Sequence, residues 1–115
     1  MGHYQDMVKE NQNLGRELRD HIPEVYAGFG ALHKAAFEEG ALSPAVKEMM
    51  AVAIAVADEC EGCIASHSRN AVRHGATEEE FAEMLGVVIL MTGGPGTVYG
   101  PKALAAYKDF KERYG

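Results

Sequence analysis

The fold is decided by residues 43–67, which read SPAVKEMMAVAIAVADECEGCIASH. Ser43 and Pro44 predict a helix start, because serine caps the free amides of a first turn and proline fits the first helical position. The apolar run Met49–Ala57 follows. Its alanines and methionines favour a helix buried on most sides over a strand of the same length.

The next segment predicts a second helix that folds back on the first. Asp58, Glu59 and Gly62 mark a turn, and a helix follows from about Glu61 to His74. Gly75 ends that helix, since glycine adopts the left-handed conformation of a helix end at no steric cost. The two helices therefore form an antiparallel hairpin, with the start of the second helix directly after its turn.

The rest of the chain reads as further helices separated by glycine and proline. They are expected at about Tyr4–Asp20, from Pro23 to Gly40, from a Thr77–Glu80 capping box toward the Gly93–Gly96 break, and from about Thr97 to Arg113. Pro101 predicts a kink or a late beginning in the last of these. No alternating strand pattern is present, so we expect one all-α domain of five to six helices over residues 1–115.

Composition excludes several classes of function. The net charge of −6 argues against nucleic acid or an anionic membrane as partner, because both reward basic patches. No basic start leads into an apolar segment of the signal-peptide type, and the longest apolar run, Met49–Ala57, is too short to span a bilayer. We therefore expect a cytoplasmic protein, in which a Cys-x-x-Cys pair is catalytic or metal-binding more often than structural.

The chemistry is concentrated at the chain's two cysteines, Cys60 and Cys63, with His67 four residues after the second. Helical positions four apart share a face, so His67 should stack one turn above Cys63. An imidazole beside a thiol favours the reactive thiolate, and a second thiol within disulfide reach completes a redox pair. At Cys60 the helix dipole lowers the pKa of the thiol, while the neighbouring acids Asp58, Glu59 and Glu61 raise it. The sequence alone does not decide which effect is larger.

The hairpin also makes Glu48 a candidate site residue. Heights along two antiparallel helices can be counted from the turn at about 1.5 Å per residue. Glu48 then lies roughly 16 Å back from the turn, His67 about 12 Å beyond it and Cys63 about 6 Å beyond it. That order permits a relay in which a carboxylate orients an imidazole that serves the thiol. The alternative is a surface carboxylate in a first helical turn, stabilised by the dipole.

These spacings carry a resemblance to a known family. The residues concerned are Glu48, Cys60, Cys63, His67, Ala71, Gly75 and Thr77–Glu80. In this pattern the chain resembles the alkylhydroperoxidase D-like proteins of the carboxymuconolactone decarboxylase superfamily. The similarity covers about Leu42 to Leu90 and extends loosely to the Gly93–Gly94 break and the final helix.

The resemblance implies an all-α helical bundle with a proton relay that feeds a redox-active cysteine pair. Cys63 would attack a peroxide or disulfide, Cys60 would resolve, and His67 with Glu48 would move the proton. A dithiol or protein reductant would restore the thiols, with no cofactor and no metal ion. Small members of the family are oligomers, so we expect a homo-oligomer, with a hexamer favoured over a trimer. One departure is Gly62, which stands where the best-studied peroxidases of the family carry a further histidine.

Other interpretations remain open at this point. Thioredoxin-type reasoning favours Cys60 as the attacking thiol. A zinc site would use Cys60, Cys63 and His67, with Glu48 or a water as the fourth ligand, in a non-catalytic oligomeric module. A decarboxylase-like enzyme would act on a small acidic lactone, but this acidic chain offers no obvious basic anchor, and true decarboxylases of the family generally lack the cysteine pair. His33 reads as a packed or solvated helical side chain.

Overall fold

The computed structural model describes residues 2–114, and within them it contains six α-helices and no strand. They are α1 (His3–His21), α2 (Pro23–Phe37), α3 (Pro44–Ala57), α4 (Glu61–Arg73), α5 (Glu78–Thr92) and α6 (Gly94–Tyr114). The expectation of an all-α fold of five to six helices, with the cysteine pair at the start of a helix, is confirmed.

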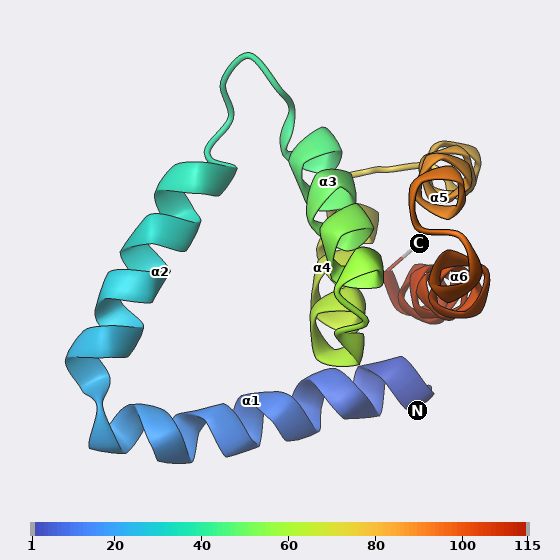
Figure 1. Cartoon of the computed structure of the whole chain (residues 1–115). Coiled ribbons are helices and arrows are strands. Elements are labelled where there is room, and N and C mark those ends of the chain that lie inside the picture. Colours follow the sequence, from blue (N-terminus) through green and yellow to red (C-terminus); the bar gives the residue numbers. More distant parts are fainter. Residues whose placement is uncertain (1, 115) are drawn as a thin grey trace.

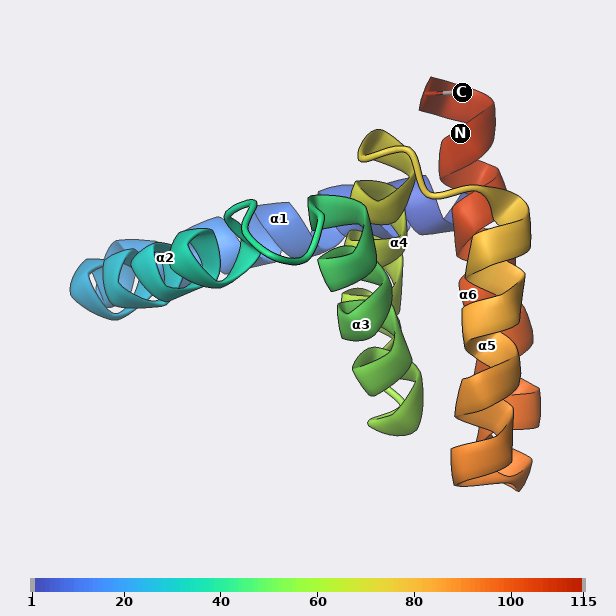
Figure 2. The same cartoon turned by 90° about the horizontal axis from the view of Figure 1, so that it is seen from above.

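Four helices form a body around one core. Helices α3 and α4 lie side by side as an antiparallel pair, and α5 and α6 form a second pair packed against them (Figures 1 and 2). The largest fully buried apolar side chains come from all four helices: Val52, Val56, Ile64, Phe81, Tyr107 and Phe110. The run Met49–Ala57 thus supplies part of the core, although Met50 and Ile54 on its other side stay exposed.

Local capping fixes where the body helices begin and end. Oγ of Ser43 accepts the amide proton of Val46 at 3.2 Å, and Pro44 occupies the first turn of α3. Thr77 and Glu80 form the expected capping box at the start of α5. Gly75 follows α4 with a φ of +87°, in the region that glycine enters freely. The sequence signals at these ends were sufficient because each is a local hydrogen-bonding arrangement.

The last helix differs from expectation. It begins at Gly94 rather than near Thr97, and Pro101 lies inside it; of the two alternatives expected from Pro101, a kink or a late beginning, the late beginning is therefore wrong. Pro95 falls in the first turn, where amides lack intrahelical partners in any case, and it therefore does not delay the helix. Gly96 permits a close approach to α5, since a side chain there would meet Cα of Ile89 at 3.0 Å.

Helix α1 is attached to the body near its start, and α2 near its end. The start of α1 is held by Asp109, whose Oδ2 accepts the amide protons of Tyr4 and Gln5 at 2.9 and 3.1 Å. At the end of α2, the carbonyl of Ala36 accepts a proton from Nζ of Lys47 in α3 at 3.0 Å. Between these attachments the two helices diverge from the body, and none of residues 14–37 is buried (Figures 1 and 2). We call residues 14–37 the arm. No helix among the described residues is both long and apolar enough to cross a membrane.

Candidate active site

The hairpin joins Glu48 of α3 to His67 of α4. Nδ1 of His67 lies 2.7 Å from Oε1 of Glu48, and the carboxylate is only 3% exposed. An ionised carboxylate at that distance accepts the Nδ1 proton, which leaves Nε2 as the nitrogen that can exchange a proton with a reactant. Glu48 is therefore no surface carboxylate, because its partner within the chain is this imidazole.

The two cysteines occupy the first turn of α4. Cys60 is its N-cap, and its Sγ accepts the amide proton of Cys63 at 3.3 Å. Their Cα atoms are 5.3 Å apart and their sulfurs are joined as a disulfide, a separation that is typical of such bonds. Cys63 is exposed and Cys60 is half-buried, so a reactant from solvent meets Cys63 first. His67 follows Cys63 by one helical turn on the same helix.

Two rings of α2 cover the imidazole. The ring of Phe37 stacks on His67 with centroids 5.5 Å apart, and the ring of His33 does so at 6.1 Å. The interpretation of His33 as a merely packed or solvated residue is incomplete, since its ring lies against the candidate relay. The missed signal is the spacing of Phe29, His33 and Phe37, which places three rings on one face of α2.

The charges around the cysteine pair are partly compensated. Nζ of Lys102 donates to Oε1 of Glu61 at 2.7 Å, across from α6 to the first turn of α4. That hydrogen bond, and then the charge of Glu61, raise the pKa of Lys102. Lys102 therefore remains a cation that offsets one of the three acids beside the cysteines. The compensation could not be anticipated from the sequence, because the two residues are 41 positions apart.

A cavity of about 900 Å³ lies at Cys63, between α1, α2 and α4. Its wall includes three arginines, Arg16, Arg19 and Arg69, together with Ser66 of α4. The sequence reasoning found no basic anchor in this acidic chain, and the structure corrects it. The sequence did carry a signal for this basic anchor, because the spacing of Arg16 and Arg19 puts both side chains on one face of α1.

Helix α1 also crosses the position where the family carries a further histidine. Gly62 lies in the first turn of α4, and a Cβ added there would stand 3.0 Å from Nδ2 of Asn11. Any side chain at this position must displace the Asn11 amide. The glycine thus accommodates α1 beside the cysteine pair, where a histidine would compete with it for space.

A metal site lacks a ligand set in the described part of the chain. Within residues 2–114, no group of three or more His, Cys, Asp or Glu side chains is arranged to hold a metal ion. The zinc interpretation required Cys60, Cys63 and His67 to converge. The three side chains do not form such a group, and the two sulfurs are joined to each other as a disulfide.

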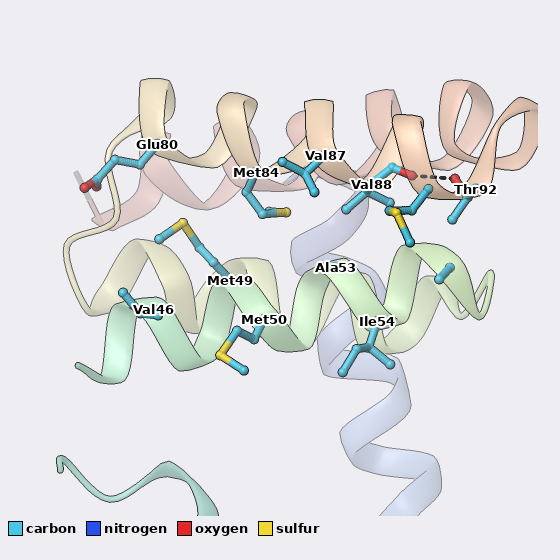
Figure 3. Close-up of a pocket in the computed structure, with 12 residues that line it drawn as sticks. Val46, Met49, Met50, Ala53, Ile54, Glu80, Met84, Val87, Val88 and Thr92 are labelled. Atoms are coloured by element: carbon cyan, nitrogen blue, oxygen red, sulfur yellow. Dashed lines mark hydrogen bonds between the residues drawn. The ribbon is translucent and has the colours of Figure 1, made fainter. Parts of the chain in front are cut away.

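A second hollow lies away from the cysteines, between α3 and α5. It has a volume of about 480 Å³, and its lining includes Met49, Met50, Ile54, Met84 and Val87; Figure 3 shows Met49 and Met84 between the two helices. Its lining is almost wholly apolar and contains neither a cysteine nor a histidine. We call this hollow the α3/α5 groove; it has the character of a packing surface rather than of a reaction site.

Comparison with known proteins now identifies the family. A model of the carboxymuconolactone decarboxylase family matches residues 23–108. The chain belongs to this family. The match begins at α2 and spans the hairpin, so it includes Glu48, both cysteines and His67, but not α1 with Arg16 and Arg19.

The relatives extend the similarity over most of the chain. A protein of Paracoccus denitrificans, described as uncharacterized protein 4 in the cox locus, is 40% identical over 103 residues, or 90% of this chain and 92% of its own. An uncharacterized protein of Cupriavidus necator is 46% identical over 85 residues, or 74% and 75% of the two chains. The crystal structure of an apo carboxymuconolactone decarboxylase family protein from Legionella pneumophila matches with a TM-score of 0.91 and 39% identity, over 94% of this chain and 96% of that one.

Proposed function

We propose that this protein is a thiol-dependent oxidoreductase that reduces a peroxide or a disulfide at Cys63. The observation that carries the proposal is the 2.7 Å contact between Glu48 and His67, one helical turn from a cysteine with a second thiol in disulfide reach. A buried carboxylate that fixes an imidazole beside a thiol is the general arrangement of an activated nucleophile. The exposure of Cys63 and the half-buried position of Cys60 support attack by Cys63 and resolution by Cys60.

With a peroxide, the Cys63 thiolate attacks one oxygen, and the O–O bond breaks. Cys63 becomes a sulfenic acid, and the leaving alkoxide becomes an alcohol by taking from Nε2 of His67 the proton that the Cys63 thiol gave up when it formed the thiolate. The Cys60 sulfur then attacks the Cys63 sulfur and expels the hydroxyl group as water. The products are an alcohol, water and the Cys60–Cys63 disulfide, so two electrons pass from the cysteine pair to the peroxide.

With a disulfide, the same thiolate attacks one sulfur and expels the other as a thiol. Cys60 then attacks the mixed disulfide at Cys63 and releases the second thiol. In either case a dithiol or a protein reductant must reopen the Cys60–Cys63 bond, and it leaves as a disulfide. The cycle needs a compartment that maintains such a reductant, and we therefore expect the protein in the cytoplasm.

A second candidate function is decarboxylation of a small acidic lactone. The three arginines beside Cys63 favour it, since they could bind the carboxylate of such a substrate. It leaves the cysteine pair without a role, however, and for that reason it ranks below thiol chemistry. Replacing both cysteines by serine separates the two, because decarboxylation should survive and thiol chemistry should not.

The decisive experiment is a thiol count with and without a reductant, beside a metal analysis and a turnover assay. We expect two titratable thiols after reduction, none after mild oxidation, and no stoichiometric metal. Peroxide or disulfide turnover should be lost in Cys63→Ser and limited to a stalled first step in Cys60→Ser. Stoichiometric zinc with unreactive thiols in freshly purified protein would refute the proposal.

We also propose that the protein works as a homo-oligomer, with a hexamer favoured, in which a second copy covers the arm. Helix α2 has no buried residue, and Val25 and Leu32 expose most of their surface. The α3/α5 groove is equally apolar and unfilled by its own chain (Figure 3). Burying each such side chain contributes about 1.5–3 kcal/mol, so a chain that leaves both surfaces in water forgoes considerable stability. Sedimentation should detect an assembly at micromolar concentration; a stable monomer would contradict it.

A further inference from the structure

All the arginines of the chain line two adjoining cavities. The chain has five, namely Arg16, Arg19, Arg69, Arg73 and Arg113. Every one of them lines either the Cys63 cavity or a neighbouring cavity of about 460 Å³ between α1, α4 and α6. The two cavities share part of their wall, including Arg16 and Arg69. In a protein with a net charge of −6, this concentration of guanidinium groups needs a reason.

The arginines nearest Cys63 are not neutralised within the chain. Among residues 2–114, the ion pairs that involve described side chains include none made by Arg16, Arg19 or Arg69. Nη1 of Arg16 donates to the neutral Oδ1 of Asn13 at 3.0 Å, and Nε of Arg69 donates to Oδ1 of Asn70 at 3.2 Å. Most of their N–H donors remain available to a ligand.

Arg69 has the strongest reason to bind an anion. It is half-buried between α1 and α4, and burial, followed by the nearby charge of Arg73, lowers its pKa, while Tyr114 and the charge of Glu48 offset only part of that shift. A guanidinium keeps its charge under such conditions, so a further opposite charge would offset the remaining cost of burial. A carboxylate fits this need because it accepts two parallel N–H bonds from one guanidinium.

We propose that the Cys63 cavity binds a small disulfide that carries carboxylate groups, with Arg16 and Arg69 holding a carboxylate while the S–S bond reaches Cys63. This inference rests on the proposed thiol function and names its substrate class. The cavity volume of about 900 Å³ is at the upper end of the range for small-molecule sites. Tyr26 and Phe29 of α2 provide aromatic surface for the uncharged part of the ligand.

A disulfide suits this site better than a peroxide. Gly62 leaves no second imidazole between the cysteines, and an alkoxide leaving group needs a proton more urgently than a thiolate does. In the reaction, the Cys63 thiolate displaces one carboxylate-bearing thiolate, which takes up a proton. Cys60 then displaces the second thiol from the mixed disulfide and forms the Cys60–Cys63 bond. One substrate disulfide is reduced to two thiols as the protein dithiol is oxidised.

The first test compares two coloured probes with the reduced protein. Dithiobis-nitrobenzoate is a disulfide with two carboxylates, and dithiodipyridine is a neutral disulfide. We expect the ratio of their second-order rate constants to fall roughly tenfold or more in Arg16→Gln and Arg69→Gln, as for the loss of a hydrogen bond to a charged group. In Arg69→Lys the ratio should lie between those of Arg69→Gln and wild type, because lysine keeps the charge but cannot donate two parallel N–H bonds. Lys111→Gln removes the same charge outside both cavities and is the matched control.

The ratio of the two rate constants distinguishes substrate binding by the arginines from a general effect on the Cys63 thiolate. If the arginines act only by stabilising the Cys63 thiolate, both probes slow equally, the ratio stays constant, and the proposal is overturned. The same holds if Lys111→Gln lowers the ratio as much as the cavity variants do, since net charge alone would then account for the effect.

A second test separates the anion site from the redox function. Cys60→Ser/Cys63→Ser has no cysteine left and cannot react with dithiobis-nitrobenzoate, so equilibrium dialysis at low salt measures binding alone. We expect saturable binding that is weakened by Arg16→Gln or Arg69→Gln and much weaker for dithiodipyridine. Binding that persists while wild-type thiols prove unreactive supports the anion site and refutes only the thiol function. No binding, with a changed assembly size in the arginine variants, would reassign the arginines to a contact between copies.

Discussion

The hairpin of α3 and α4 and the arm of residues 14–37 differ in how much of their apolar surface is buried within the chain. The hairpin contributes core residues such as Val52 and Ile64 and encloses Glu48, so its partners lie within its own chain. The arm contains apolar side chains of comparable size, yet Leu32 remains 66% exposed. Both segments are helical. Helix formation therefore depends on local pattern, whereas burial depends on which partner is available.

The two regions meet at the cysteines. The hairpin carries the groups that we propose to react, Cys60, Cys63, His67 and Glu48, while the arm supplies Arg16 and Arg19 with the rings that cover His67. A buried element thus holds the proposed reacting groups, and a less buried element lines the cavity beside them. This division is common where a site must be precise at the reacting atoms and adaptable around the substrate.

The largest expected effect comes from one aliphatic side chain in each region. Ile64→Ala, at a fully buried position of the hairpin, should lower the free energy of unfolding by about 2–5 kcal/mol through lost burial and a cavity. Leu32→Ala in the arm should cost less than about 1 kcal/mol in dilute protein. Urea unfolding of both variants at several protein concentrations provides the measurement.

The concentration dependence decides what the arm does. If a second copy covers Leu32, the cost of Leu32→Ala should grow with protein concentration, because association stabilises the native state by mass action. A concentration-independent cost as large as that of Ile64→Ala would show that the arm packs within its own chain, and the contrast between the regions would disappear.

A second prediction tests the relay inside the hairpin. Glu48→Gln should slow peroxide or disulfide turnover roughly ten- to a thousand-fold, and His67→Ala should act similarly, because both disturb one proton-transfer unit. The double variant should be little slower than either single variant, since members of one unit are not additive. The measurement is the rate of Cys63 alkylation against pH, resolved from Cys60 by mass spectrometry, in the four proteins.

The control for this relay comes from the arm. His33→Ala removes the ring that stacks on His67 but leaves the bond to Glu48 in place. It should change the alkylation profile far less than Glu48→Gln does. A wild-type profile in Glu48→Gln would mean that the carboxylate only stabilises the fold.

The sequence was sufficient for the hairpin and for the start of α5 because their determinants are local. Ser43, the Thr77–Glu80 box and Gly75 specify helix ends through hydrogen bonds within a few residues, and height counted from one turn brought Glu48 near His67. The family spacing pointed to the same residues. The beginning of the last helix was placed wrongly, because Pro95 lies in its first turn and the helix starts before Thr97.

The surroundings of the site could not be predicted in the same way. Arg16 and Arg69 are 53 positions apart in the chain, and their shared cavity depends on the angle at which α1 crosses α4. That angle is set by tertiary contacts such as those of Asp109, for which the sequence carries no periodic signal. The exposed arm adds a further unknown, because its packing partner is outside the chain.

A third, smaller effect concerns tyrosines in the two regions. The hydroxyl of Tyr107 in the body donates to the carbonyl of Ala76 at 2.6 Å, and Tyr107→Phe should cost about 1–3 kcal/mol by leaving that buried carbonyl unpaired. Burial, and then the charges of Glu78 and Glu80, raise the pKa of Tyr107 above its ordinary 10.0. The matched variant in the arm, Tyr26→Phe, should leave stability nearly unchanged.

The sign of the pH dependence follows from that shift. A raised folded-state pKa means that Tyr107 contributes its stability fully below pH 10.0, and loses it as the pH rises through the folded value. Urea unfolding should be measured between pH 8 and 11, a range around the ordinary tyrosine pKa of about 10. As the pH rises, the free energy of unfolding should fall less in Tyr107→Phe than in wild type. Tyr4, whose pKa burial also raises, leaves a residual loss in both proteins. An identical alkaline slope in the two proteins would contradict the assignment.

The smallest expected effect concerns Glu59 in the turn of the hairpin. It distinguishes the influence of the Glu59 backbone conformation on the cysteines from the influence of its charge. Glu59 has a φ of +57°, in the left-handed region that non-glycine residues enter at a cost, directly before Cys60. Glu59→Gly relieves that cost but increases the freedom of the unfolded chain, so the free energy of unfolding should rise by about 0.5 kcal/mol or less.

Glu59→Gln keeps the backbone cost and removes only the charge. If local charge opposes the thiolate, both variants should accelerate Cys63 alkylation by roughly twofold or less near neutral pH, because this acid is exposed and screened. Acceleration in Glu59→Gly alone would instead assign the effect to the turn, and would make the backbone before Cys60 a determinant of how the first turn of α4 presents the pair.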